Sequence, residues 1–287
     1  MEMLEIYKLI RTRKPALVEH ALSIWEKSHI SQADILIETI KYAETGLIET
    51  ALKLAARYHP ETCAGEIARL FANSDSRVRR IAIQAVNERM SEACAEPLAN
   101  LLATENDVFV LASAANAAAE LHLDVKHLER ALQHQDVRVR ANAVRAAAIC
   151  SPARIQELLE PMLQDKALRV QNEALKALAQ FIPEADLEQL ICKRLQSENP
   201  SIRASTTFIC GELPLSMRLA LLIDSLHDKD PRVVSNAARS LCRIGDILGI
   251  SAVIALYFAT PDQHLANSLL RYLRPVDRSV FNEQAEK

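Results

Sequence analysis

The chain has 287 residues, of which 49% are hydrophobic and only 4% aromatic, with just 5 glycines, a composition that indicates helices and little β-structure. It carries 34 basic and 37 acidic side chains and a formal net charge of −3, which excludes a strong overall positive field for gathering nucleic acid or anionic lipid. The longest apolar stretch, 247–259, is too short to span a bilayer, and the acidic start of the chain is unlike a signal peptide.

An apolar residue, called the anchor below, recurs along the chain every 29 to 32 residues. The anchors are Leu17, Leu47, Val78, Val110, Val139, Val170, Ile202 and Val233. Other positions are counted from the anchor, so that position +4 lies four residues after it. Position +4 is alanine in every repeat but one, where it is Thr206, and position +8 is mostly apolar. A stripe at 0, +4 and +8 predicts one buried helix face, and a period of this size predicts a solenoid of stacked repeats.

Ahead of the regular repeats, residues 1–13 are expected to form a short helix that caps the open end of the array. Trp25, the only tryptophan, lies at position +8 of the first anchor and is interpreted as a packing residue rather than a binding residue. Ser31 is expected to cap a helix that runs to about residue 43. Gly46 is expected to separate that helix from the one that follows.

Each regular repeat is expected to consist of a first helix, A, a turn, and a second helix, B, which contains the anchor. The predicted A helices are 61–72, 92–103, 124–133, 152–164, 184–196, 214–226 and 247–259. Most B helices open after an acid or amide that can accept the free N–H groups of the first turn, namely Asp75, Asp107, Asp136, Asn199 and Asp230. One repeat has Ala167 at this place. The last apolar face is expected at Leu265, Leu269, Leu270 and Leu273, followed by a polar tail.

Arginines cluster in the first turn of the B helices, where a cation is disfavoured by about 0.3–1 kcal/mol. They lie one residue before the anchor (Arg77, Arg138, Arg169, Arg232) and one residue after it (Arg79, Arg140, Arg203). The favoured interpretation is a ladder of ion pairs with the capping acids, such as Asp75 with Arg79 and Asp136 with Arg140. The alternative is a row of guanidinium groups presented to an acidic ligand.

The titratable residues do not converge on a catalytic pattern. The six cysteines are interpreted as core residues, and the equivalent repeat positions of Cys63 and Cys94 favour burial over an activated thiol beside His59. No cysteine or histidine spacing predicts a disulfide or a metal site, and no glycine-rich phosphate loop or Gly-x-Ser-x-Gly motif occurs. We therefore predict no catalytic residue, no metal and no cofactor, and enzymatic activity is the less favoured alternative.

Three segments, 75–79, 136–140 and 230–233, each place an aspartate, an arginine and a valine at the start of an alanine-rich helix. They resemble the HEAT and HEAT-like repeats of the phycobilisome-lyase type, closely over 44–245 and loosely at both ends. The resemblance implies an all-α fold, a right-handed α-α superhelix or solenoid of about eight or nine helix pairs. We expect one array over 1–287, with an N-terminal cap and first unit at 1–43, regular repeats at 44–245, and a C-terminal cap and tail at 246–287.

In HEAT arrays the B helices line the concave side, so the resemblance implies that their exposed positions, +3, +6 and +10, face a binding surface. Position +6 combines cations, amides and one aromatic side chain, a mixture suited to an extended acidic or polar peptide. The predicted protein-binding residues are Lys53, Gln84, Asn116, Asn142, Arg145, Lys176, Phe208 and Arg239. The alternative is that this row is only the solvated face of soluble helices.

These features predict a non-catalytic scaffold of the bacterial cytoplasm that binds a protein partner, one with an acidic or polar segment, along its concave surface. The alternative implied by the resemblance is a bilin-lyase-like subunit for chromophore attachment, or a chaperone subunit. The deoxyhypusine hydroxylase family also has HEAT-like units, but its iron ligands are His-Glu pairs, and this sequence has no His-Glu dipeptide. Nucleic-acid binding is less favoured because of the near-neutral charge and the lack of clustered aromatic residues, and no membrane association is expected.

Overall fold

A computed structural model of the chain describes residues 3–12, 14–27, 33–42, 45–213 and 216–275. These residues form α-helices and short 3-10 helices, and no strand occurs among them. The chain divides into two compact units, Met1–Leu158 and Leu159–Lys287. The expected Ser31 cap and the polar tail lie outside the described residues, and a single array over 1–287 stays a prediction.

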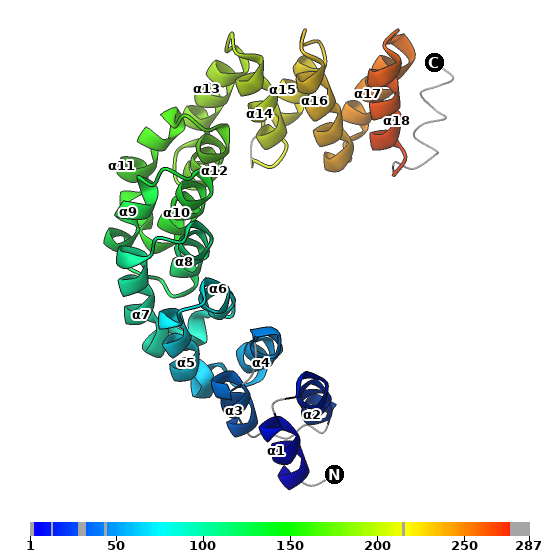
Figure 1. Ribbon diagram of the computed structural model, residues 1–287. Coiled ribbons are helices and arrows are strands. Elements are labelled where there is room, and N and C mark those ends of the chain that lie inside the picture. Colours follow the sequence, from blue (N-terminus) through cyan, green and yellow to red (C-terminus); the bar gives the residue numbers. More distant parts are fainter. Residues whose placement is uncertain (1–2, 13, 28–32, 43–44, 214–215, 276–287) are drawn as a thin grey trace. The chain divides into compact units, whose positions relative to one another are not determined.

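The first unit consists of two layers of helices, with the A helices in one layer and the B helices in the other (Figure 1). The A layer contains α1 (Met3–Arg11), α3 (Asp34–Tyr42), α5 (Pro60–Arg69) with η1 (Leu70–Ala72), η2 (Glu88–Met90) with α7 (Ser91–Thr104), η3 (Val125–Leu128) with α9 (Glu129–Leu132), and η4 (Pro152–Arg154) with α11 (Ile155–Leu159). The B layer contains α2 (Pro15–Lys27), α4 (Thr45–Tyr58), α6 (Ser76–Gln84), α8 (Val108–Glu120) and α10 (Val137–Cys150). From α2 to α10, successive B helices of this unit pack against one another, and each also packs against the A element of its own repeat.

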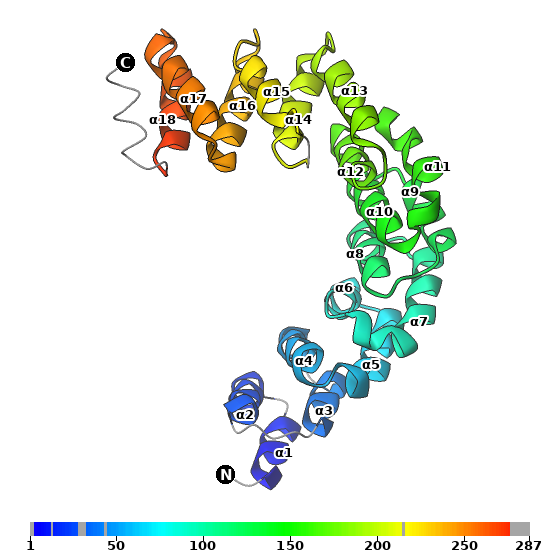
Figure 2. The same ribbon diagram turned by 180° about the vertical axis from the view of Figure 1, so that it is seen from behind.

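The second unit continues the same alternation, which Figure 2 shows from behind. Its A elements are η5 (Pro161–Gln164), α13 (Glu184–Leu195), α15 (Arg218–Ser225) and α17 (Ile247–Ala259). Its B helices are α12 (Leu168–Leu178), α14 (Pro200–Cys210), α16 (Pro231–Ile244) and α18 (Gln263–Leu273). Leu269 and Leu273 of α18 are buried against this unit's core, as the apolar pattern predicts.

Two predicted A helices are broken into short pieces. The predicted helix 152–164 is η4, α11 and η5, and the break before η5 falls at Pro161, which has no N–H to continue the helical hydrogen bonding. The predicted helix 124–133 begins as the 3-10 helix η3 and becomes α-helical only at Glu129. Gly46 does not separate two helices, because α4 already begins at Thr45.

The residues at position +4 are fully buried in the repeats where the stripe is seen most clearly. Ala51, Ala82, Ala114 and Ala143 in the first unit are 0% exposed, and so is Thr206 of the second unit. The Thr206 hydroxyl accepts a hydrogen bond of 3.2 Å from Nε of the buried Arg194, so its oxygen is not left unpaired in the core. Small residues at these buried positions allow neighbouring helices to approach closely.

Side-chain caps stand at the B-helix starts where the sequence predicts them. The carboxylate or amide oxygen of each cap accepts the N–H two residues further on, and the caps are Asp75, Asp107, Asp136, Asn199 and Asp230. Ala167 occupies the same extended backbone position before α12 but offers no such acceptor. The N–H groups in the first turn of α12 therefore lack the side-chain acceptor that a capping residue provides in the other repeats.

Replacing Ala167 with asparagine is expected to stabilise the protein by about 0.5–1 kcal/mol, because the side chain would supply the missing cap without adding charge beside Asp165. Asn199 already performs this function in the next repeat. Urea unfolding followed by circular dichroism would measure the effect, with Ala167→Gln as the control that adds an amide one carbon too far away. A gain that is equal in both variants would contradict the capping explanation.

Candidate functional site

The predicted binding residues lie on the B helices, five in the first unit and three in the second. Lys53, Gln84, Asn116 and Arg145, all at position +6 in the first unit, are exposed. In the second unit Arg239 is exposed, whereas Lys176 and Phe208 are half-buried. The helical phase inferred from the sequence therefore puts position +6 on the outer face of the B helices.

Three of the predicted residues form one hydrogen-bonded cluster in the first unit. Nη2 of Arg145 donates to Oδ1 of Asn116 at 2.7 Å and to Oδ1 of Asn142 at 3.1 Å. Nδ2 of Asn142 in turn donates to the carbonyl oxygen of Ala112 at 2.7 Å. The cluster links α8 to α10 and fixes the guanidinium of Arg145 through neutral groups. No acid in the described part of the chain forms an ion pair with Arg145.

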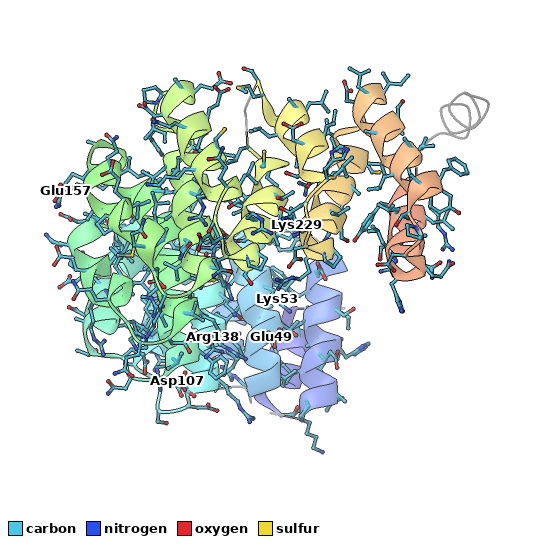
Figure 3. The ribbon with its side chains drawn as sticks, turned by 90° about the horizontal axis from the view of Figure 1, so that it is seen from above. Glu49, Lys53, Asp107, Arg138, Glu157 and Lys229 are labelled. Carbon is cyan, nitrogen blue, oxygen red and sulfur yellow. The ribbon has the colours of Figure 1, made fainter. Side chains whose placement is uncertain are left out.

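The two lysines of the predicted row are neutralised by neighbouring acids. Nζ of Lys53 lies 2.7 Å from Oε1 of Glu49, one turn earlier on α4, and Figure 3 labels both residues on this helix. Nζ of Lys176 pairs with Glu212, which also lies 3.2 Å from Nη1 of Arg243. Burial would raise the pKa of Glu212, but hydrogen bonds from the two cations outweigh it, so the pKa lies below its usual value. The row is consequently less cationic than its sequence indicates.

Phe208 and Arg239 form a pair across α14 and α16. The guanidinium carbon of Arg239 lies 5.6 Å from the centre of the Phe208 ring, within the range of a cation–π contact. Within the described residues Arg239 forms no ion pair. Arg145 and Arg239 are therefore the two cations of the predicted set that no carboxylate compensates, one in each unit, whereas Gln84 is simply exposed on α6.

The arginines one residue after the anchor bind the loop before their helix. Nη1 of Arg79 donates to the carbonyl oxygens of Asn73 and Ser74, at 2.8 and 3.2 Å. Its Nε and Nη2 donate to the two carboxylate oxygens of Glu105, at 2.8 and 3.1 Å. The expected partner, Asp75, is instead the helix cap, and the ion pair reaches the acid of the next repeat's loop.

Arg203 of the second unit repeats this arrangement, which indicates that it belongs to the repeat itself. Its guanidinium binds both carboxylate oxygens of Asp228, at 2.8 and 2.9 Å, and the carbonyl oxygens of Ser197 and Glu198. Sequence reasoning missed Glu105 and Asp228. The signal was present as an acid 25 or 26 residues after each arginine, but only a structure shows that this separation brings them together.

The arginines one residue before the anchor pair with their own capping acids in two repeats. Arg138 binds Asp136 through Nε and Nη2, at 3.0 and 2.8 Å, and Arg232 binds Asp230 at 3.0 and 2.9 Å. The favoured ladder interpretation is confirmed for these two residues. The hydrogen bonds from Arg232, together with the backbone N–H of the same residue, hold the pKa of Asp230 at about 2.

The cysteines lie in or beside the core. Burial raises the pKa of the Cys63 and Cys94 thiols to about 11, so neither is an activated nucleophile at neutral pH. Sγ of Cys94 donates a weak hydrogen bond to the Ala64 carbonyl at 3.6 Å. Trp25 is also buried, as predicted, and packs edge-on against Tyr58 at 5.9 Å between ring centres. Among the described residues no cluster of histidine, cysteine and acidic side chains is placed to hold a metal ion.

These observations define the fold: the described residues form an all-α, HEAT-like repeat fold whose exposed B-helix faces carry its polar clusters. None of the helices in the described ranges combines the length and the apolar character needed to cross a membrane.

Comparisons with known proteins support this fold. The solved structure of YibA from Escherichia coli is similar to this chain, with a TM-score of 0.51 and 16% identity over 84% of this chain and 92% of YibA. Phycocyanin lyase from Nostoc sp., solved as the complex of CpcE and CpcF, matches with a TM-score of 0.47 and 15% identity over 86% of this chain and 95% of that one. Kap121p bound to Nup53p has a TM-score of 0.47 and 13% identity over 100% of this chain and 36% of that one. No protein-family model matches the sequence, and no curated protein matches it. At these identities the likeness to YibA establishes the fold alone.

Proposed function

We propose that the protein is a non-catalytic scaffold that binds a segment of a partner protein along the exposed faces of its B helices, with α8 and α10 at the centre of the surface. The observation that carries the proposal is the state of Arg145. Its guanidinium is exposed, fixed by the amide oxygens of Asn116 and Asn142, and without an acidic partner among the described residues.

A fixed but uncompensated guanidinium is suited to recognition for two reasons. Holding a flexible side chain in place costs about 0.5–1.5 kcal/mol on binding, and the amides of Asn116 and Asn142 have already restricted this one. Because these amides are neutral, the positive charge stays available, and the remaining N–H groups can donate to a carboxylate or a backbone carbonyl of the partner. An arginine that served only the fold would be expected to bind an acid, as Arg79 does.

The cysteines support a reducing compartment such as the cytoplasm as the place of action, because all six are free thiols. The partner that fits Arg145 is a protein segment with acidic or polar side chains. In the second unit, the half-buried Phe208 with Arg239 is a separate candidate contact for such a segment.

A selection of short random peptides displayed on phage would test the scaffold function without a known partner. We expect the native chain to enrich a family of peptides whose affinity falls about tenfold when Arg145 is replaced with glutamate. Lys126→Glu on η3 is the matched control, since it makes the same charge change at an exposed site in the A layer. Circular dichroism would verify that both variants keep the native helix content. The proposal fails when no peptide is enriched, or when the enriched peptides bind the Arg145→Glu variant as tightly as the native chain.

A further inference from the structure

Three successive B helices of the first unit carry a local positive charge that the whole chain does not have. Together α6, α8 and α10 contain six arginines and one acid, Glu120, and their capping residues add Asp75, Asp107 and Asp136. Six cations against four acids leave a local excess of positive charge, although the formal net charge of the protein is −3. The arginines are Arg77, Arg79, Arg80, Arg138, Arg140 and Arg145. A local field of this kind attracts an acidic partner to one face of the molecule.

Half of these arginines have no ion pair with a described acid. Arg79 binds Glu105 and Arg138 binds Asp136, whereas Arg77, Arg80 and Arg145 make no such pair. Nε of Arg80 is also the one buried side-chain nitrogen or oxygen atom in the described ranges that has no hydrogen-bond partner. The buried Nε of Arg80 is not accessible to a partner, but Arg77 and Arg145 are exposed, so α6 and α10 each present a guanidinium whose N–H groups can donate to an acidic side chain.

An exposed aromatic residue stands between these two helices in the repeat order. Phe109 occupies the position just before its anchor on α8, which is the position that Arg77 has on α6 and Arg138 has on α10. We call these three residues the edge row. The Phe109 side chain is 54% exposed, and the guanidinium carbon of Arg138 lies 4.4 Å from its ring centre. One face of the ring is therefore covered by a cation, and the ring is positioned to pack against an apolar side chain.

We propose that the edge row binds an extended acidic segment of the partner in which an apolar side chain packs on Phe109 and an acidic side chain on either side of it pairs with the arginines of α6 and α10. This inference rests on the proposed scaffold function and names the chemistry of its partner. Neighbouring helices pack about 8–10 Å apart, and an extended chain advances about 3.3 Å per residue. One step between B helices therefore corresponds to about three residues, so the motif is an acid, an apolar residue about three positions later, and a second acid about three positions after that.

A peptide fits this surface better than a nucleic acid does. The edge row is bordered by the capping carboxylates of Asp75, Asp107 and Asp136. Hydrogen bonds from the Val110 and Phe109 N–H groups hold the pKa of Asp107 below its usual value, and hydrogen bonds from Arg138 do the same for Asp136, so both carboxylates remain charged. A continuous polyphosphate backbone would lie across these charges, whereas a peptide with isolated acids can avoid them. Phe109 also offers a single ring, and no stack of aromatic side chains on which successive bases could lie accompanies it in the edge row.

Fluorescence anisotropy with the full-length chain tests the inference. The probe is a fluorescein-labelled peptide of glycine and serine that carries glutamate, phenylalanine and glutamate at the spacing derived above. We expect saturable binding that weakens about fivefold when Phe109 is replaced with alanine, and that also weakens when either spacing is lengthened by one residue. Phe181→Ala is the matched control, since Phe181 is another exposed phenylalanine, 42% exposed, located outside the edge row.

A charge exchange tests the register. Arg77→Glu is expected to weaken binding about fivefold, and replacing one of the two peptide glutamates with lysine is expected to restore it. Only one of the two glutamates should give this rescue, and which one does so reveals the direction of the bound chain. Arg77 is exposed and its side chain has no partner in the described ranges, so the substitution is not expected to unfold the protein.

The inference is overturned by binding that is insensitive to Phe109→Ala and to peptide spacing, or by a single-stranded oligonucleotide that binds more tightly than the peptide and competes with it. Its failure can be told apart from failure of the scaffold function. If phage selection yields peptides that require Arg145 but lack the acidic pattern, the scaffold remains and only the edge-row assignment is rejected. If selection yields no peptide, both are rejected.

Discussion

Replacing Ala143 with aspartate is expected to cost about 4 kcal/mol of stability or more, because it places an unpaired carboxylate in a fully buried helix seam. Ala143 is 0% exposed on α10, and the stripe residues one turn to either side, Val139 and Ala147, are 0% and 1% exposed. The added side chain would also separate helices that the alanine allows to pack closely. Equilibrium unfolding in urea, followed by far-UV circular dichroism, should show a large fall in the midpoint or loss of the folded baseline.

The matched control is Ile149→Asp on the same helix. Ile149 is 48% exposed, so the same acid stays hydrated there and is expected to change the free energy of unfolding by less than about 0.5 kcal/mol. Since repeat arrays can unfold in parts, the loss for Ala143→Asp should appear first in the repeats that flank α10, which amide hydrogen exchange would resolve. Equal midpoints for the two variants would contradict the stripe as the seam of the stack.

The fold could be predicted because the small residue that close helix packing requires recurs at a regular spacing in the sequence. A close helix contact favours a small residue, so alanine stands one turn after every anchor except Ile202, which is followed by Thr206. The spacing of these positions gives the number of repeats. Breaks in helices were less predictable. Pro161 interrupts its A element, whereas Pro97 lies inside α7 without ending it, and the difference depends on the packing of each helix rather than on the proline itself.

The candidate site could be predicted only in part, for a related reason. Helical phase correctly exposes Lys53, Asn116 and Arg145, since phase is a local property. Charge compensation is not local. The pairing of Lys176 with Glu212, at position +10 of the following repeat, depends on the stagger between neighbouring helices, which no single repeat encodes. Sequence therefore indicates which residues face solvent, whereas the structure shows which of them retain an unused charge.

The arginines of a repeat fall into two groups, one that stabilises the fold and one that is available to a partner. One residue after the anchor, Arg79 and Arg203 connect a loop to the acid of the next repeat and are largely enclosed. On the outer face, Arg77 and Arg145 make no ion pair with a described acid. Substitution of Arg79 or Arg203 is expected to lower the stability of the fold. Substitution of Arg77 or Arg145 is expected to lower the affinity for a partner and to leave the stability nearly unchanged. Stability and partner affinity are therefore expected to respond to different arginines.

Arg79→Ala is expected to destabilise the protein by about 3 kcal/mol at neutral pH, because it removes four hydrogen bonds and leaves a carboxylate enclosed without its cation. The side chains of Arg79 and Glu105 are only 17% and 8% exposed, so water would compensate little of the loss. Arg79→Lys should recover a small part of the stability, since a single ammonium group cannot bind two carbonyls and both carboxylate oxygens together. Arg77→Ala, two residues away and exposed, is the control and should have a small effect.

The dependence of this loss on pH follows from Glu105. Burial would raise its pKa, but hydrogen bonds from Arg79 and from the Asp107 and Asn106 N–H groups outweigh burial, so the folded pKa lies below the ordinary value of 4.5. The ionised carboxylate therefore contributes stability above pH 4.5, and this contribution disappears as the pH falls through the folded pKa. Without Arg79 the burial is opposed only by the two N–H groups, and the carboxyl group protonates more readily.

The stability difference between the native chain and the Arg79→Ala variant should consequently be largest at neutral pH and should shrink below the ordinary pKa of a glutamate. Urea midpoints measured in both pH ranges would test this. A difference that stays constant with pH would show that Arg79 stabilises the fold through the two loop carbonyls rather than through Glu105.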